Sequence, residues 1–254
     1  MTEYQSETPA AARRVAVPFA DVHEMPLAHG PRGKMETQLV FGETFKVELE
    51  ADGWCRGYCA HDGYPGWLHI THLAPAALAA THIVTAARSH AFAGPTIKTT
   101  LAQTYSFGSK VRVVEEGEKF AQLEDGSWIY RAHLTPRAEL HADYVETAKK
   151  FLETPYYWGG RSGFGIDCSG LVQVCLSRAG IKSDRDTELQ TGTLGKVADT
   201  APDRGDFVFF PGHVGIMVDN KNIIHANAFH MKVAIEPLET VEERSNGITA
   251  VRRL

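Results

Sequence analysis

The chain has 254 residues, of which 43% are hydrophobic and 22% are charged, and its formal net charge is −5. This length and composition allow a full hydrophobic core, arranged in one large domain or in two to three small ones. The acidic balance and the lack of a Lys/Arg-rich block argue against nucleic acid or an anionic membrane as the main partner.

Residues 1–14 read as a disordered or clasping N-terminal tail, whose first ten residues are polar and acidic. They contain no basic segment that leads into an apolar one, and no apolar run elsewhere reaches the ~18 residues that a membrane span needs. If the chain starts natively here, we expect a cytoplasmic protein without a membrane partner. Its 4 cysteines are then expected to be reduced thiols.

Residues 15–80 are predicted to form a first small all-β domain. Short apolar segments such as 37–43, 45–49 and 54–60 are joined by Asp-Gly turns, which is typical of strands in a small barrel.

Residues 81–136 repeat this pattern and are predicted to form a second barrel. The clearest echo is Arg131-Ala132-His133-Leu134, which matches Ile70-Thr71-His72-Leu73. A Pro-Ala segment, residues 74–80, separates the two copies.

Residues 137–254 are predicted to form the last domain. Residues 143–152 read as a helix that Pro155 ends, and strands are expected at 205–210, 213–218, 222–228, 232–238 and 248–254. The fold class is therefore α+β, with two small β barrels followed by a domain of helices packed on an antiparallel sheet.

A glycine-rich loop leads into an amphipathic helix that is predicted to begin near Cys168. Apolar residues recur at helical spacing from Cys168 to Ala179, with Asp167 as a plausible N-cap and Gly180 just past the end. The first turn of a helix favours a thiolate over a thiol, so Cys168 is the candidate nucleophile. The alternative for a lone cysteine is a buried structural thiol.

Two histidines follow where a base and its orienting group are needed. His213 opens a predicted strand after a Pro-Gly turn, and His225 lies on the next strand. Adjacent antiparallel strands can bring the two rings together, with His213 as general base and His225 hydrogen-bonded to it. His225 also has a competing interpretation as a satisfied core histidine.

In this order and spacing, three blocks resemble the NlpC-type papain-like cysteine peptidases of bacterial cell walls. They are Asp-Cys-Ser-Gly-Leu at 167–171, Gly-His-Val-Gly-Ile at 212–216 and Ile-His-Ala at 224–226, and the resemblance covers residues 144–254. The Gly-Trp near the end of the first β domain is similar to bacterial SH3-like domains. The resemblance implies a papain-like catalytic domain without a cofactor, in which Tyr156 and the backbone N–H of Cys168 stabilise the oxyanion.

Members of this family with a pair of SH3-like domains cleave the γ-D-glutamyl–diamino acid bond of peptidoglycan peptides and require a free N-terminal L-Ala. The resemblance implies that Glu36, Tyr64 and Asp167 bind that amine, because a carboxylate pair recognises an ammonium group by charge-assisted contacts. Taken singly, these residues read as a solvated edge charge, a turn residue and a plain helix cap.

The family also carries an Arg-Asp-Ser element that contacts the D-glutamate carboxylate, and here it reads Arg185-Asp186-Thr187. Trp158 is expected to line the pocket, and the implied substrate-binding set is Glu36, Tyr64, Trp158, Asp167, Ser169, Arg185 and Thr187. The expected function is a peptidase of murein peptide recycling that releases L-Ala-D-Glu. Its expected partner is a murein peptide, and the oligomeric state stays open.

Other interpretations remain. The chain fits an exported wall hydrolase that cuts intact stem peptides, or a non-catalytic wall-binding module. A zinc site at Cys55 and Cys59, with His61, His69 and His72 nearby, is not expected, because cysteines at this spacing lie too far apart along one strand.

Overall fold

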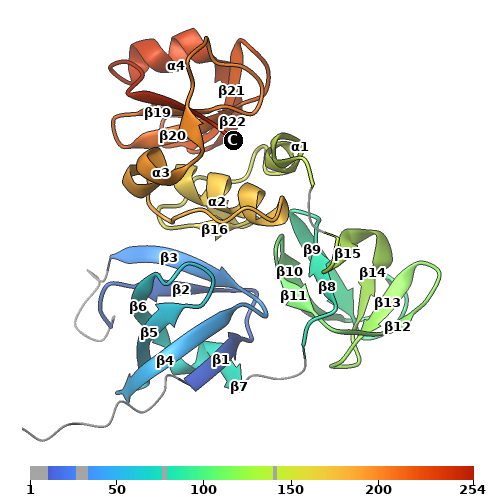
Figure 1. The fold of residues 1–254 in the computed structure, drawn as a ribbon. Coiled ribbons are helices and arrows are strands. Elements are labelled where there is room, and N and C mark those ends of the chain that lie inside the picture. The colour runs from blue at the N-terminus through green and yellow to red at the C-terminus, as the bar shows by residue number, and fades with distance from the viewer. Residues whose placement is uncertain (1–10, 27–33, 76–78, 140–141) are drawn as a thin grey trace, which may run out of the picture.

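The computed structural model describes residues 11–26, 34–75, 79–139 and 142–254, which form three units (Figure 1). The greater part of the predicted N-terminal tail, residues 1–10, lies outside the described residues. Its last part differs from the prediction, because Ala11–Val15 forms strand β1 between two other strands.

The first β unit is a seven-stranded antiparallel sheet in the order β3-β2-β6-β5-β4-β1-β7. Its core contains Val15, Leu39, Phe45 and Leu68, which come from strands whose alternate side chains point inward. The remaining strands are β2 (Phe19–His23), β3 (Met35–Val40), β4 (Thr44–Ala51), β5 (Trp54–Cys59), β6 (Pro65–His69) and β7 (Leu73–Pro75), with the 3-10 turn η2 (Ile70–His72).

The second β unit has a five-stranded sheet, β10-β9-β14-β13-β12, and a three-stranded sheet, β11-β8-β15. Its elements are β8 (His82–Val84), β9 (Arg88–Phe92), β10 (Leu101–Ser106), β11 (Lys110–Val111), β12 (Val113–Glu116), β13 (Phe120–Leu123), β14 (Trp128–Tyr130), η3 (Arg131–His133) and β15 (Leu134–Pro136).

The internal repeat is confirmed at the level of single hydrogen bonds. The carbonyl of His72, at the end of η2, accepts from Ala16 at 2.8 Å, and the carbonyl of His133, at the end of η3, accepts from Thr85 at 2.8 Å. The all-β character of both units is therefore as predicted. Closure of the sheets into barrels is not found in the part of the chain that the structure describes.

The third unit is a six-stranded antiparallel sheet with helices on both faces, and Figure 1 shows it between α2 on one side and α4 on the other. The predicted strands are present, and each bound lies within two residues of the expected one. They are β19 (Phe207–Phe210), β20 (His213–Met217), β21 (Asn222–Asn227), β22 (Lys232–Pro237) and β23 (Ala250–Arg253).

Several short elements of this unit were not predicted from the sequence. They are α3 (Thr187–Thr193), α4 (Leu238–Arg244), the edge strand β18 (Lys196–Val197) and the hairpin of β16 (Arg161–Ser162) and β17 (Gly165–Ile166). The first helix, α1 (Tyr144–Lys149), is shorter than expected. Helices this short depend on packing for their stability, so the sequence alone gives a weak signal for them.

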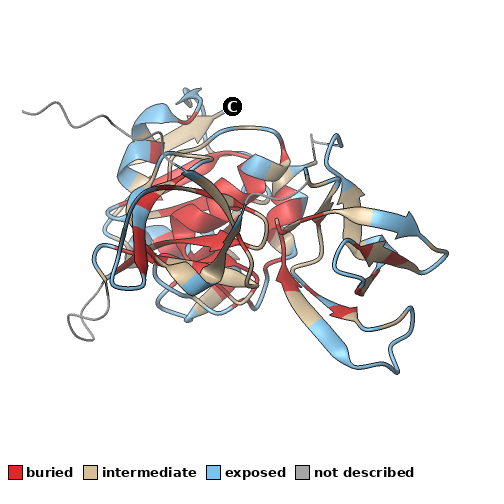
Figure 2. Cartoon of the chain, turned by 90° about the horizontal axis from the view of Figure 1, so that it is seen from below, coloured by how far each residue is buried: buried red, intermediate tan, exposed pale blue. Residues whose placement is uncertain are grey.

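Helix α2 (Cys168–Arg178) begins and ends as predicted, with Asp167 as N-cap and Gly180 in the left-handed conformation after the last turn. It is buried more widely than the amphipathic pattern indicated, since Ser169, Gly170 and Gln173 are also buried. The reason is that α2 lies between the sheet on one side and the β units on the other. Figure 2 shows this buried helical segment at the centre of the molecule.

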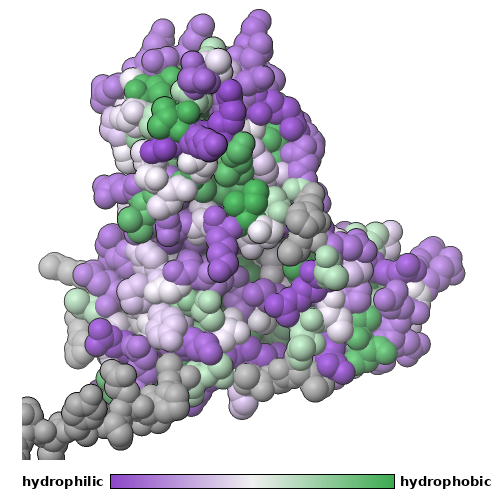
Figure 3. All heavy atoms as spheres, in the orientation of Figure 1, coloured by the Kyte–Doolittle hydropathy of each residue, from purple (hydrophilic) through white to green (hydrophobic). Residues whose placement is uncertain are grey.

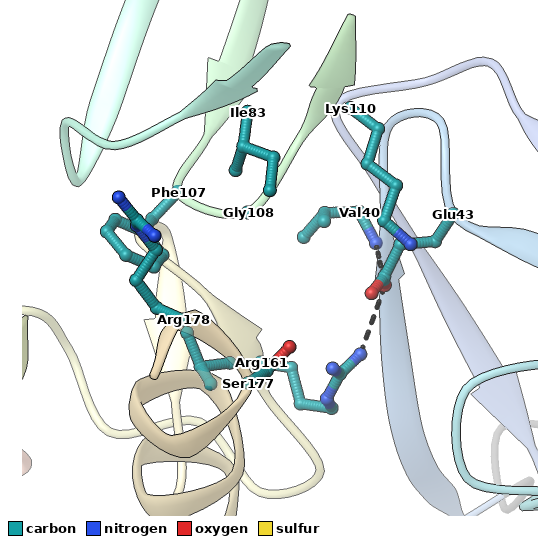
Figure 4. Close-up of a pocket in the computed structure, with 10 residues that line it drawn as sticks. Val40, Glu43, Ile83, Phe107, Gly108, Lys110, Arg161, Ser177 and Arg178 are labelled. Atoms are coloured by element: carbon teal, nitrogen blue, oxygen red, sulfur yellow. Dashed lines mark hydrogen bonds and ion pairs between the residues drawn. The ribbon is translucent and has the colours of Figure 1, made fainter. Parts of the chain in front are cut away.

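Buried side chains join the β units to the third unit. The buried guanidinium of Arg161 donates to the carbonyl of Gln38 at 2.7 Å and to the carboxylate of Glu43 at 3.1 Å, beside a cavity of about 50 Å³ (Figure 4). Burial raises the pKa of Glu43, but the Arg161 charge, further nearby positive charges and a hydrogen bond from the Val40 backbone together outweigh burial and hold the pKa at about 2. Phe107 of the second β unit packs in the core of the third unit, edge-on to Phe151 with 5.2 Å between the ring centroids.

Polar residues cover most of the face seen in Figure 3, and apolar residues form separate patches. Among the helices of the described residues, none combines the length and the apolar character that a membrane crossing requires.

Candidate active site

Cys168 stands at the first position of α2, where the chain arrives through the hairpin of β16 and β17. The carboxylate of Asp167 accepts from the backbone N–H of Gly170 at 2.7 Å and from that of Gly159 at 2.8 Å, so it fixes both the helix start and the incoming loop. The sulfur of Cys168 lies 3.7 Å from the hydroxyl of Thr187. The structure therefore places Cys168 in the first turn of a capped helix, as predicted.

The predicted resting thiolate is not supported. Burial raises the pKa of the Cys168 thiol and the carboxylate of Asp167 raises it further, whereas hydrogen bonds from Thr187 and from the backbone of Val214 and Ser169 lower it less. Desolvation therefore outweighs the helix terminus in the free protein. The thiol needs a base to lose its proton.

His213 and His225 meet as predicted, with Nε2 of His213 2.7 Å from Nδ1 of His225. Burial, and then the neighbouring His225, lower the pKa of His213 to about 3, so its ring is neutral at neutral pH. The backbone N–H of Val214, the residue after His213, hydrogen-bonds the sulfur, so Cys168 lies beside the start of β20. No hydrogen bond joins the sulfur to the His213 ring within the described residues, as is common in substrate-free sites.

A carboxylate that was not predicted from the sequence completes this row of side chains. Oε1 of Glu236 lies 2.8 Å from Nε2 of His225, and the guanidinium of Arg244 holds Glu236 with two hydrogen bonds of 2.8 and 3.0 Å. The Arg244 contact and the neighbouring histidines lower the pKa of Glu236 to about 2. The alternation of side chains along β22 was the available signal, but it does not identify the strand that Glu236 faces.

A pocket of about 370 Å³ opens at Cys168 and is lined by residues of both the third unit and the first β unit. It brings together Tyr156 and all of the substrate-binding residues implied by the resemblance: Glu36, Tyr64, Trp158, Asp167, Ser169, Arg185 and Thr187. The pocket also contains residues that were not predicted to bind substrate: Lys34, Asp186, Glu188 and Gly212.

Arg185 is largely occupied by protein partners. Its two terminal nitrogens contact the two oxygens of Asp167 at 2.6 and 3.0 Å, one of them also donates to Ser169 at 2.8 Å, and Nε donates to Thr37 at 2.9 Å. A guanidinium has five N–H groups, so one remains free for a substrate. Arg185 therefore holds Asp167 and α2 in place, in addition to any contact with a ligand.

The acidic end of the pocket is built around Tyr64 of the first β unit. Its hydroxyl lies 3.2 Å from a carboxylate oxygen of Asp186 and 3.5 Å from one of Glu36, whose other oxygen pairs with Lys34 at 3.1 Å. Burial and the charge of Asp186 raise the pKa of Tyr64, so the phenol stays protonated and donates. Asp186, which was not predicted to bind substrate, is thus a carboxylate in direct contact with Tyr64.

Two aromatic residues flank the sulfur. Tyr156 is half-buried, and burial together with the neighbouring Cys168 raises its pKa to about 12, so its hydroxyl remains a hydrogen-bond donor. Trp158 is 58% exposed, and the ammonium of Lys34 lies 5.6 Å from its ring centroid. The indole therefore forms a rim of the pocket rather than a deep wall.

Cys55 and Cys59 pack in the core of the first β unit, and burial raises the pKa of both thiols. The described residues contain no group of three or more side chains arranged to hold a metal ion.

Comparison with known proteins finds two matching families. Residues 153–251 match the NlpC/P60 family, and residues 27–73 match the bacterial dipeptidyl-peptidase SH3 domain.

Two relatives extend over most of the chain. A gamma-D-glutamyl-L-lysine dipeptidyl-peptidase of Bacillus cereus is 27% identical over 243 residues, which cover 82% of this chain and 72% of the relative. A protein of the same name from Bacillus subtilis is 28% identical over 248 residues, covering 86% and 81%.

Among solved structures, that of an NlpC/P60 family protein from Bacillus cereus superimposes with a TM-score of 0.82. It covers 96% of this chain and 99% of the other at 22% identity, so this likeness concerns the fold.

Proposed function

Because this chain is a cysteine peptidase with an NlpC/P60 domain and a bacterial dipeptidyl-peptidase SH3 domain, we propose that it cleaves γ-D-glutamyl–diamino acid bonds in peptidoglycan-derived peptides. The substrate carries a free N-terminal L-Ala, and the first product is L-Ala-D-Glu. The observation that carries this proposal is the shared pocket, in which the nucleophile Cys168 and the acidic end around Tyr64 face the same space.

In the reaction that we propose, His213 removes the proton of Cys168 as the sulfur attacks the γ-carbonyl carbon of D-glutamate. The backbone N–H of Cys168 and the hydroxyl of Tyr156 stabilise the oxyanion. His213 then gives its proton to the departing α-amine of the diamino acid, which leaves a thioester on Cys168. Water, activated by His213, hydrolyses the thioester and releases the dipeptide.

The preference for a free amine is supported by the charges at the acidic end. Four carboxylates and two cations line the pocket, and one cation, Arg185, is already paired with Asp167. The carboxylates of Glu36 and Asp186 beside Tyr64 favour an ammonium group there. Hydrogen bonds between charged groups are stronger than those between neutral groups. An N-acylated peptide has no such charge and also needs space for its acyl group.

The experiment compares L-Ala-γ-D-Glu-L-Lys with its N-acetylated form, and mass spectrometry follows release of the dipeptide. Losing one or two charge-assisted hydrogen bonds of about 1.5–3 kcal/mol each corresponds to a loss in kcat/KM of about tenfold for a single weak bond and up to about 10⁴-fold for two strong ones. Equal cleavage of the two peptides would contradict the amine requirement. Cleavage of intact sacculi would favour an exported wall hydrolase, and the Cys168→Ala variant controls for contaminating activity.

We further propose that the reaction belongs to cytoplasmic recycling of murein peptides, since a free L-Ala amine arises only after the peptide has been detached from its glycan. Fractionation of cells with an antibody against the protein tests the location. The second β unit is proposed to be a second SH3-like domain, because it repeats the hydrogen bonds of η2 at η3.

A further inference from the structure

The row of side chains behind His213 extends to Glu236, and we infer that Glu236 is a positioning residue that sets the tautomer and the basicity of the catalytic histidine pair. The inference rests on the proposed role of His213 as the base. It concerns contacts that run from β20 across β21 and β22 to α4, on the face of the sheet opposite to α2.

The sheet explains why these side chains meet. His225 pairs with Ala234 in the register of β21 and β22, so Glu236 is its diagonal neighbour on the same face. On the other side of His225 stands Gly215, where an added Cβ would lie 3.1 Å from the Cβ of His225. The glycine leaves room for the His225 ring to reach His213.

The proton order in this row follows from the carboxylate. Glu236 is ionised, so it can only accept, and Nε2 of His225 must carry the hydrogen of their 2.8 Å contact. Nδ1 of a neutral His225 is then an acceptor, so Nε2 of His213 donates to it over 2.7 Å. This leaves Nδ1 of His213 without a proton. Glu236 thereby selects the tautomer of His213 that can act as a base.

A neutral neighbour does not overturn this assignment. Nδ2 of Asn227 lies 3.2 Å from Nε2 of His225, which is longer than the contact with Glu236. The amide oxygen of Asn227 accepts from the backbone of His230 at 2.8 Å, which fixes the orientation of the amide. The charged oxygen at 2.8 Å therefore decides which ring nitrogen carries the hydrogen.

Charge is the second contribution of Glu236. When His213 takes the proton of Cys168, positive charge develops on the pair of rings, and the carboxylate stabilises it. Glu236 on β22 and Arg244 on α4 face the pair of histidines. Glu236 raises the pKa of both rings, whereas Arg244 lowers the pKa of both. His230 also lowers the pKa of His225. Glu236 and Arg244 therefore act on the base in opposite directions.

The test uses alkylation of Cys168 by iodoacetamide as a function of pH, located by mass spectrometry. This reaction needs the thiolate but no peptide substrate. In Glu236→Gln we expect alkylation at pH 7 to be about tenfold slower and the midpoint of the pH profile to move up by about one unit. Glu239→Gln, which changes an exposed carboxylate of α4, is the matched control and should behave as the wild type.

In the Arg244→Gln variant we expect the midpoint of the alkylation profile to shift in the opposite direction from that in Glu236→Gln. Removing this cation should move the midpoint down, because Arg244 lowers the pKa of both histidines. A purely structural role of the Glu236–Arg244 pair predicts that both variants shift in the same direction or not at all, and either result overturns the inference. If Glu236→Gln fails to fold, as judged by circular dichroism, the sign of the Arg244→Gln shift alone decides.

Turnover separates this inference from the proposed function. On a cleavable peptide we expect Glu236→Gln to lower kcat by about 10- to 100-fold with little change in KM, because Glu236 lies behind the histidines and outside the pocket. If the murein tripeptide is not cleaved by the wild type but the alkylation shifts are as expected, the role of Glu236 stands and the proposed substrate falls. If the wild type cleaves the tripeptide but Glu236→Gln leaves both alkylation and turnover unchanged, the proposed substrate stands and the role of Glu236 falls.

Discussion

Replacing Arg185 with methionine removes the guanidinium that contacts both oxygens of Asp167, immediately before the nucleophile. The two side chains are 2% and 9% exposed, so the carboxylate would remain in a poorly solvated place without its cation. Removing one partner of a buried ion pair costs about 3–5 kcal/mol in the free energy of unfolding. Asp167→Asn should cost a similar amount, because it leaves the Arg185 charge buried and unpaired.

The double variant Asp167→Asn/Arg185→Met carries neither charge, so it should lose much less than the sum of the two single changes. We expect a coupling free energy of about 3 kcal/mol, obtained from urea unfolding of the four proteins at pH 7. The asparagine oxygen can still accept from the N–H of Gly170, which keeps the start of α2 capped.

The chain offers a matched control. Asp143 also caps a helix, α1, and also pairs with an arginine, Arg204, at the same distance of 2.6 Å, but these side chains are 43% and 44% exposed. Exposed pairs contribute about 0–1 kcal/mol, so the coupling in this cycle should be small. If the buried pair gives no more coupling than the exposed one, the reasoning that Arg185 works mainly by neutralising Asp167 is wrong.

Three further predictions concern the whole fold. Phe107→Ala should lower the free energy of unfolding by about 3–5 kcal/mol in urea, because the ring is 2% exposed in the peptidase core, and a loss below 1 kcal/mol would refute this anchoring role. Gly163→Ala should loosen the second β unit, measured by limited proteolysis, since its Cβ would lie 2.0 Å from the carbonyl oxygen of Ala87; an unchanged digestion pattern would contradict it. Stability should also fall as the pH drops from 6.5 towards 4.5, because the folded pKa of His213 is lowered to about 3 and the unfolded chain binds the proton more tightly. We expect about 1–2 kcal/mol after allowing for its partial exposure, and a constant urea midpoint between pH 7 and 4.5 would oppose this.

Local patterns in the sequence were sufficient for the elements that carry the chemistry. The start of α2 at Cys168, its cap Asp167 and the strand that opens with His213 were all predicted, because periodicity, capping and turn residues act between near neighbours in the chain. The sequence echo between residues 70–73 and 131–134 was also visible locally, and in the structure it corresponds to the two 3-10 turns η2 and η3. The shorter helices α3 and α4 were missed, since packing rather than local propensity stabilises them.

The roles of the charged residues were harder to predict from the sequence than the elements that carry them. Nothing in the local sequence indicates that Glu236 faces His225, because this depends on the register of two strands. The sequence also assigned a thiolate to Cys168 from the helix terminus, whereas burial in the folded structure raises its pKa. Desolvation is a property of the assembled structure, so it has no signature in the order of residues.

The sequence by itself thus predicted a candidate nucleophile, a candidate base, and the helix and strand that carry them. Only the tertiary structure decided which charges share the pocket: Tyr64 meets Asp186 across 122 positions of the chain, and Arg185 meets Thr37 across 148. Contacts of this kind form when separately folded units pack together, and their geometry is set by the shapes of the packed surfaces rather than by neighbours in the chain.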